Sequence, residues 1–213
     1  MKLFLYSGGS REQNEEMNQS LVKQLPLDST FCFIPSQSDK TRKYFEEFKA
    51  WFGYCGYENF KYFDLDEEYD ETKLLEVQES DAIYLSGGNT FHFLYNIKMR
   101  GFDKFLRLFV QRGSILIGLS AGSYIMTPSI AYTVEYHRWK GDFEELNVDK
   151  INDFKAVGLV DFEIVPHFDH EDKRDFTEKY KKTTRNMIYG MYDGSGIIVK
   201  DKKIEFVGNI VEL

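Results

Sequence analysis

The chain has 213 residues, of which 42% are hydrophobic and 16% aromatic, and its formal net charge is −8. This acidic balance, without any lysine- or arginine-rich run, argues against nucleic acid or an anionic membrane as a general partner. No stretch approaches the roughly 20 apolar residues of a membrane span, and the apolar run after Met1 meets Gly8 and Gly9 too soon for a signal peptide. We therefore expect a cytoplasmic protein.

Short apolar runs alternate with helical periodicity in the first half of the chain. A capping box at Ser10–Gln13 opens a first helix, a second begins near Asp39, and a third runs from Thr90 to about Arg112 with a break at Gly101. Apolar strands are expected around these helices at 3–6, 31–34, 62–65, 82–85 and 115–117. This alternation predicts an α/β fold with a mostly parallel sheet flanked by helices.

The second half of the chain is less regular. An apolar run at 162–165 precedes Pro166, and the runs 197–199 and 204–207 predict a C-terminal β-hairpin at one edge of the sheet. Residues 132–155 are expected to form a loop with short strands beside the site. No repeat or linker divides the sequence, so residues 1–213 are expected to form one domain.

Cofactors are not expected. Cys32 and Cys55 are the only cysteines, and they are typical of small buried hydrophobic residues in a reducing compartment. No further ligands lie at the close spacing that a metal site needs.

The sharpest chemical signal is Gly118-Leu119-Ser120-Ala121-Gly122, directly after the strand at 115–117. A G-x-S-x-G pentapeptide at a strand-to-helix turn is typical of a nucleophile elbow, where the serine hydroxyl projects at the carboxyl end of the sheet. The backbone N–H of Ala121 can then stabilise an oxyanion. Ser120 is therefore the candidate nucleophile.

A second glycine turn, Ser86-Gly87-Gly88-Asn89, follows the strand at 82–85. Turns after parallel strands share one edge of the sheet, so Gly88 could present its N–H to the same oxyanion. The alternative is a tight turn in which Asn89 or Thr90 caps the next helix.

A serine nucleophile needs a general base, and the chain has four histidines: His92, His137, His167 and His170. His167 ranks first because it follows an apolar run and so lies at a strand end, and His137 is a distant second. A carboxylate should orient the imidazole. On the residues alone Glu135, Asp161, Glu163 and Asp169 all stay open.

Three segments together resemble the peptidase E (aspartyl dipeptidase) and cyanophycinase family. They are Gly118-Leu119-Ser120-Ala121-Gly122-Ser123, Gly87-Gly88-Asn89-Thr90-Phe91 and Pro166-His167-Phe168, in the family's order and at similar spacing. The resemblance implies a class I glutamine amidotransferase-like fold and hydrolysis of small peptides with an N-terminal aspartate. It also implies that Ser120 is the nucleophile and His167 the base, and that the amides of Gly88 and Ala121 form the oxyanion hole.

Two positions depart from the family pattern. The position that matches the family's catalytic aspartate is Glu135, so the resemblance implies a Ser-His-Glu triad. The family's Gly-Glu-Thr-Arg segment, whose arginine reads the acidic substrate side chain, is here Glu171-Asp172-Lys173-Arg174. Arg174 is therefore the candidate substrate-binding residue.

Two other functions remain open. An esterase of the α/β-hydrolase type uses the same elbow, although this chain is short for that fold and has no H-G-G-G oxyanion loop. A non-catalytic protein could also retain the pocket as a ligand site. The sequence says nothing about the oligomeric state.

Overall fold

The computed structural model describes residues 1–143 and 153–213, and the predicted α/β fold with its mostly parallel sheet is confirmed. The main sheet has the strand order β3-β2-β4-β5-β1-β8-β9. Its first five strands in chain order run parallel to one another, whereas β8 lies antiparallel to β1 and β9 antiparallel to β8. The strands are β1 (Lys2–Tyr6), β2 (Thr30–Ile34), β3 (Asn59–Tyr62), β4 (Ala82–Leu85), β5 (Ile115–Leu119), β8 (Gly196–Lys200) and β9 (Lys203–Val207).

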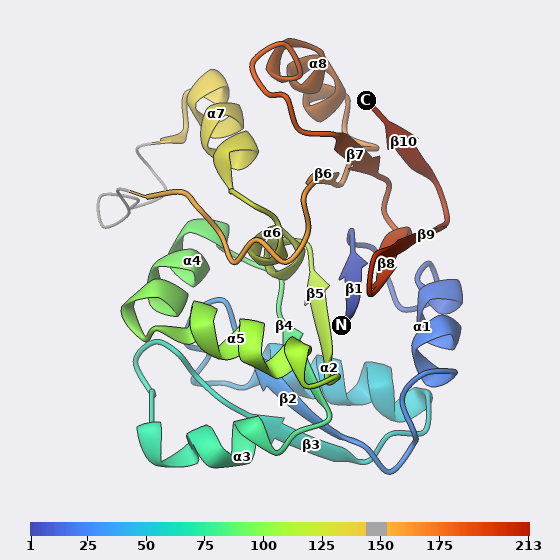
Figure 1. Ribbon diagram of the computed structural model, residues 1–213, viewed down its shortest axis with the longest axis vertical. Helices are drawn as coiled ribbons and strands as arrows, with labels where there is room; N and C mark the ends of the chain where they lie inside the picture. The colour runs from blue at the N-terminus through green and yellow to red at the C-terminus, as the bar shows by residue number, and fades with distance from the viewer. Residues whose placement is uncertain (144–152) are drawn as a thin grey trace.

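Helices cover both faces of this sheet (Figure 1). One face packs against α1 and α2 in a cluster rich in phenylalanine, and the other packs against α3 to α6. Parallel strands that are buried on both faces have continuous apolar sequences, which explains the runs seen in β1, β2, β4 and β5. The helices are α1 (Glu15–Val22), α2 (Lys43–Tyr54), α3 (Leu74–Gln78) after the short 3₁₀ turn η1 (Glu71–Lys73), α4 (Thr90–Met99), α5 (Phe102–Gln111) and α6 (Ala121–Met126).

A second, three-stranded sheet of order β10-β7-β6 lies beyond the carboxyl ends of β1 and β5 (Figure 1). Here β6 and β7 are parallel, and β10 is antiparallel to β7. The aromatic rings of Tyr132, Phe176 and Tyr180 join the two helices beside this sheet. These elements are β6 (Glu163–Pro166), β7 (Ile188–Met191), β10 (Ile210–Glu212), α7 (Ala131–Lys140) and α8 (Glu171–Tyr180).

Most of the predicted elements are confirmed, and the third strand and the loop predicted over residues 132–155 are the exceptions. The hairpin forms as β8 and β9, and the break at Gly101 separates α4 from α5 because Gly101 has φ +62°. The capping box bonds form at Ser10 and Gln13, but α1 itself begins only at Glu15.

The third strand was expected at 62–65 and instead spans Asn59–Tyr62. The expectation of a loop over 132–155 was also wrong for its first part, since α7 occupies it. Residues 144–152 of that segment lie outside the described residues.

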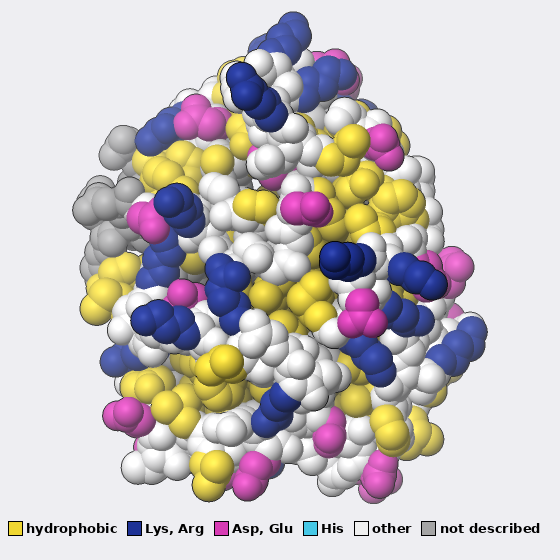
Figure 2. Space-filling model, viewed as in Figure 1, with side chains coloured by type: hydrophobic (Ala, Val, Ile, Leu, Met, Phe, Trp, Pro, Cys, Tyr) yellow, Lys and Arg dark blue, Asp and Glu magenta, His cyan; other side chains and the backbone are white. Residues whose placement is uncertain are grey.

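The surface carries mixed charge. Figure 2 shows lysine and arginine side chains interspersed with aspartate and glutamate on the face that it presents, with apolar patches between them. Within the described ranges, no helix is both long enough and apolar enough to cross a membrane.

Candidate active site

Ser120 lies at the sharp turn between β5 and α6, with backbone angles of φ 50° and ψ −101°. Such angles are strained for a residue with a side chain, and the surrounding bonds hold them in place. The Ser120 N–H and the Ser123 hydroxyl both donate to the carbonyl of Tyr6, at 3.0 and 2.8 Å. A Cβ on Gly122 would lie 2.7 Å from the carbonyl carbon of Leu85, so only glycine lets α6 approach β4 this closely. This is the geometry of a nucleophile elbow.

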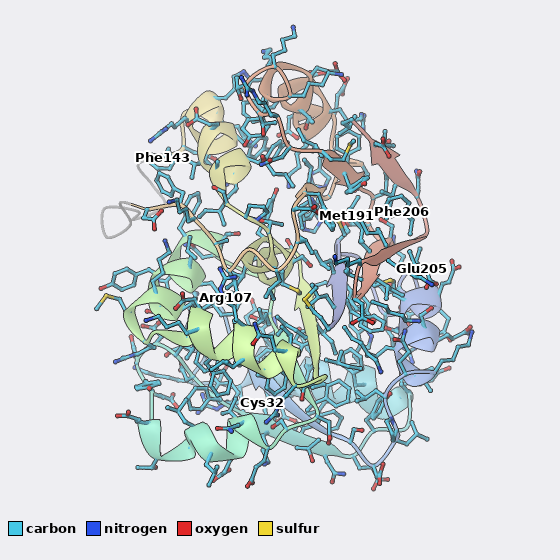
Figure 3. The ribbon with its side chains drawn as sticks, viewed as in Figure 1. Cys32, Arg107, Phe143, Met191, Glu205 and Phe206 are labelled. Atoms are coloured by element: carbon cyan, nitrogen blue, oxygen red, sulfur yellow. The ribbon has the colours of Figure 1, made fainter. Side chains whose placement is uncertain are left out.

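His167 reaches Ser120 from the smaller sheet. Its Nε2 lies 2.9 Å from Ser120 Oγ. The backbone of His167 is also left-handed, with φ 58°, and its N–H donates to the buried hydroxyl of Ser7. That hydroxyl donates in turn to the carbonyl of Met191, the last residue of β7 in the smaller sheet (Figure 3). The end of β1 thus fixes the position of the imidazole relative to the serine.

The second imidazole nitrogen contacts a carboxylate that sequence reasoning missed. Nδ1 of His167 lies 2.7 Å from Oδ1 of Asp193. Asp193 follows β7, and because β6 and β7 are parallel neighbours their carboxyl ends meet. Gly8 leaves the space for this pair, since a Cβ there would lie 2.5 Å from the Asp193 carboxylate and would collide with the imidazole ring.

The expectation that Glu135 orients the imidazole is corrected by this geometry. Glu135 lies on α7, where its carboxylate pairs with Arg138 at 2.6 Å and its side chain is 49% exposed. The other carboxylates that were left open, Asp161, Glu163 and Asp169, have no hydrogen bond to the imidazole in the described parts of the chain. The structure brings Asp193 to His167 in their place.

The remaining histidines lie elsewhere. His137, the second candidate base, pairs with Asp142 at 2.9 Å on α7. His92 lies 2.8 Å from Asp66, and exposed His170 is the residue before α8. None of the three has a hydrogen bond to Ser120 among the residues that the structure describes.

The electrostatics of the pair favour a neutral imidazole. Burial lowers the pKa of His167 below its ordinary value; the carboxylate of Asp193 opposes this shift, and the ammonium of Lys173 adds to it. Lys173 donates to the carbonyl of Pro166 at 2.7 Å, and burial lowers its own pKa to about 8. A neutral imidazole can accept the proton of a serine hydroxyl, which a protonated one cannot.

The predicted oxyanion donors lie at the ends of adjacent strands. β4 and β5 pair in parallel, with Leu85 opposite Gly118, so the turn at Gly88 and the elbow at Ala121 share one edge of the sheet. Neither of these two backbone N–H groups has an acceptor within residues 1–143 and 153–213. The side chain of Asn89 caps α4, as the alternative interpretation of this turn expected.

Arg174 lies in α8, and its guanidinium is engaged. Nη1 donates to the carbonyls of Phe168 and Asp169, at 3.2 and 2.5 Å. In this position Arg174 holds the loop that follows His167.

Together, these contacts form one chain of hydrogen bonds from Ser120 through His167 to Asp193. Such a chain can move the hydroxyl proton to the imidazole and stabilise the imidazolium that results. A sequence signal for Asp193 does exist: like His167, it follows a short apolar run at a strand end, and Gly194 comes directly after it.

Comparison with known proteins gives the same family at the level of sequence and of structure. A family model described as peptidase family S51 matches residues 3–207. An uncharacterized peptidase of Listeria monocytogenes is 30% identical over 131 residues, which are 61% of this chain and 61% of the relative. This aligned part is thus about three fifths of that relative's length.

Two further matches cover more of the chain. A peptidase E of a Nostoc species is 25% identical over 217 residues, covering 94% of this chain and 78% of the relative. The crystal structure of a candidate peptidase E from Listeria monocytogenes superposes with a TM-score of 0.73 at 25% identity, covering 97% of each chain.

Proposed function

The chain belongs to peptidase family S51, and we propose that it is a serine peptidase that hydrolyses small peptides with Ser120 as its nucleophile. The observation that carries this proposal is the hydrogen-bonded series Ser120, His167 and Asp193, with successive distances of 2.9 and 2.7 Å. A structural serine at a strained turn needs neither a neutral imidazole nor a carboxylate behind it.

In the proposed reaction, Ser120 Oγ attacks the scissile carbonyl carbon while Nε2 of His167 takes the hydroxyl proton. The resulting imidazolium then protonates the leaving amine, and an acyl-enzyme remains on the serine. Water enters, gives a proton to the same imidazole and attacks the ester carbonyl carbon. The bond to Ser120 Oγ then breaks, the imidazolium returns its proton to that oxygen, and the acid is released. Asp193 keeps the imidazole in the tautomer that accepts at Nε2, and stabilises its charged form.

The amides of Gly88 and Ala121 are the proposed oxyanion donors. Support comes from their position at the shared edge of β4 and β5 and from their lack of acceptors in the described residues. Each donor of this kind contributes roughly 10²–10³ in rate in comparable sites.

An N-terminal aspartate is the proposed substrate feature that the resemblance to peptidase E supports. Arg174 is the proposed reader of its carboxylate, through a bidentate guanidinium contact. For this role the guanidinium has to exchange its hydrogen bonds with the carbonyls of Phe168 and Asp169 for contacts with substrate.

A cytoplasmic location is also part of the proposal. Both cysteines are free, and Cys32 is fully buried, as expected in a reducing compartment. Recovery of the native protein from a membrane or an extracellular fraction would contradict it.

The test of the proposal is turnover by wild type, Ser120→Ala and His167→Ala on a panel of dipeptides and short-chain esters. We expect both variants to lose nearly all activity, and by similar factors, because members of a triad act as a unit. His137→Ala serves as the matched control and should retain activity. Preference for esters over every peptide would favour an esterase, and wild-type turnover by Ser120→Ala would contradict the proposal.

A further inference from the structure

A cavity of about 540 Å³ lies next to the Gly87–Gly88 turn, on the side of the sheet that α2 covers. This volume is in the range of small-molecule sites. The cavity is bounded by the loop that follows β2, by α2 and by the end of β4, and it also reaches Gly9 and Leu119. A substrate whose carbonyl oxygen meets the amide of Gly88 therefore has this cavity within reach of a side chain.

The lining combines aromatic rings with carboxylates. Asp39 and Glu47 supply two negative charges, and the lining contains no lysine, arginine or histidine among the described residues. Hydrogen bonds from the side chain of Thr41 and from nearby backbone N–H groups lower the pKa of Asp39, so it stays charged. Within residues 1–143 and 153–213, the only cation paired with Glu47 is Lys43, 3.9 Å away, and it does not line the cavity. The rings are those of Phe33, Tyr44, Phe48, Trp51 and Tyr84.

Two hydroxyl groups that line this cavity have free hydrogen-bonding capacity. Ser36 as a whole residue is 4% exposed, and its Oγ has no hydrogen-bond partner within the described residues. A Cβ on Gly88 would collide with this oxygen, so Ser36 lies directly against the proposed oxyanion turn. The hydroxyl of Tyr84, which also lines the cavity, likewise has no hydrogen bond in the part of the chain that the structure describes. Both oxygens are therefore available to a ligand in the cavity.

We propose that this cavity is a side-chain subsite that selects a basic side chain, lysine or arginine, and rejects an acidic one. The proposal rests on the peptidase function above and names the class of substrate for one side of the scissile bond. The aromatic walls can pack the aliphatic stem of such a side chain and attract its charge. The carboxylates of Asp39 and Glu47 attract the cationic head, and the hydroxyls of Ser36 and Tyr84 offer it neutral acceptors.

An acidic side chain has no comparable partner at this position. It would meet two carboxylates and, as far as the described residues extend, no cation in the lining. We take a ligand charge about 6 Å from a charge of the lining, with the high effective dielectric of a partly exposed site. Under these conditions one unit of lining charge changes the affinity for a singly charged side chain by about fivefold. An N-terminal aspartate, if Arg174 reads it, must therefore bind on the other side of the catalytic serine.

Binding of dipeptides to the inactive Ser120→Ala variant tests the subsite in the absence of turnover. Isothermal titration measures the Kd of Ala-Lys, Lys-Ala, Ala-Glu, Glu-Ala and the corresponding norleucine dipeptides, so that both peptide positions are sampled. In one of the two positions we expect lysine to bind at least about fivefold more tightly than glutamate, with norleucine between them.

Charge reversal at Glu47, compared with the same change at a neighbouring residue outside the cavity, provides a matched control. Glu47→Lys and Glu46→Lys change similarly exposed residues, 60% and 61%, on the same helix, but only Glu47 lines the cavity. In the Ser120→Ala background, Glu47→Lys should reduce the preference for lysine over norleucine by about 25-fold, because it changes the local charge by two units and each unit changes affinity by about fivefold. Glu46→Lys should leave the preference unchanged.

Failure of the proposed subsite and failure of the proposed peptidase function give different results in these experiments. Equal Kd values for lysine and glutamate peptides, equal effects of the two charge reversals, or no binding of any lysine peptide would overturn the inference. Charge-selective binding without turnover by the wild type would contradict the peptidase proposal and leave the subsite standing.

Discussion

Asp193→Asn tests the proposed catalytic geometry at one atom. The substitution retains the shape of the side chain and replaces a carboxylate oxygen, 2.7 Å from His167 Nδ1, with an amide group. The amide can donate to Nδ1, which moves the imidazole proton to Nε2, the atom that lies 2.9 Å from Ser120 Oγ. A protonated Nε2 cannot accept the hydroxyl proton, so the base is lost while the fold is retained.

The expected loss follows from other triads of this type. Removal of the charge and reversal of the tautomer lower kcat by about 10⁴, which corresponds to about 5.4 kcal/mol of transition-state stabilisation. The assay is kcat and KM on the best substrate of the dipeptide panel, with circular dichroism to show that the fold is unchanged. KM should change little, because Asp193 touches His167 rather than the substrate.

Glu135→Gln is the matched control, since it makes the same chemical change at the residue that the family resemblance implied. It removes an exposed ion pair with Arg138, which contributes at most about 1 kcal/mol to stability. Activity should stay close to wild type. A loss of less than tenfold in Asp193→Asn, or a greater loss in Glu135→Gln, would refute the assignment of Asp193.

Four further predictions concern the imidazole and the substrate site beside it. Because the pKa of His167 is lowered, kcat/KM should fall only as the pH drops below about 6.5. Lys173→Met removes a charge that lowers this pKa, so the acid limb of the pH profile should move to higher pH, and an unchanged or opposite shift would argue against this coupling. Gly8→Ala should cost at least about 100-fold in kcat, because its Cβ would lie 2.5 Å from Asp193 and displace it from the imidazole; retained kcat in a folded variant would show that the pair is dispensable. Arg174→Ala should raise KM for Asp-Leu far more than for Ala-Leu if Arg174 reads the substrate, whereas an equal effect on both peptides excludes that role.

The sequence predicted the parts of the fold and the site that depend on local pattern. The serine, the histidine and the glycine turn each follow a short apolar run, and such runs end at the edge of a parallel sheet where side chains converge. The break at Gly101 and the capping box at Ser10 are likewise local signals, and both are found in the structure.

The third member of the site depends on long-range pairing and so escaped prediction. Asp193 meets His167, 26 residues earlier in the chain, only because β7 pairs in parallel with β6 in a separate small sheet. Nothing local in the sequence fixes that pairing. Glu135 was implied only by the resemblance to the peptidase E family, and α7 turns its side chain toward Arg138.

Helix α7 itself was missed for a related reason. Its sequence contains Tyr132, Thr133, Val134 and Tyr136, residue types that favour strands in isolation. Packing of Tyr132 against Phe176 and Tyr180 of α8 overrides that local preference. The third strand was placed three residues late because its own residues are only partly buried, whereas Phe63 and Leu65 beyond it are fully buried.

The central claim is that Ser120 is a nucleophile activated by His167. A fluorophosphonate probe, followed by mass spectrometry of the intact protein and of its peptides, tests it without knowledge of the substrate. The account predicts one covalent adduct per chain, located on Ser120, and no adduct in Ser120→Ala or His167→Ala. An unlabelled wild-type protein, or an adduct on any residue other than Ser120, would contradict it.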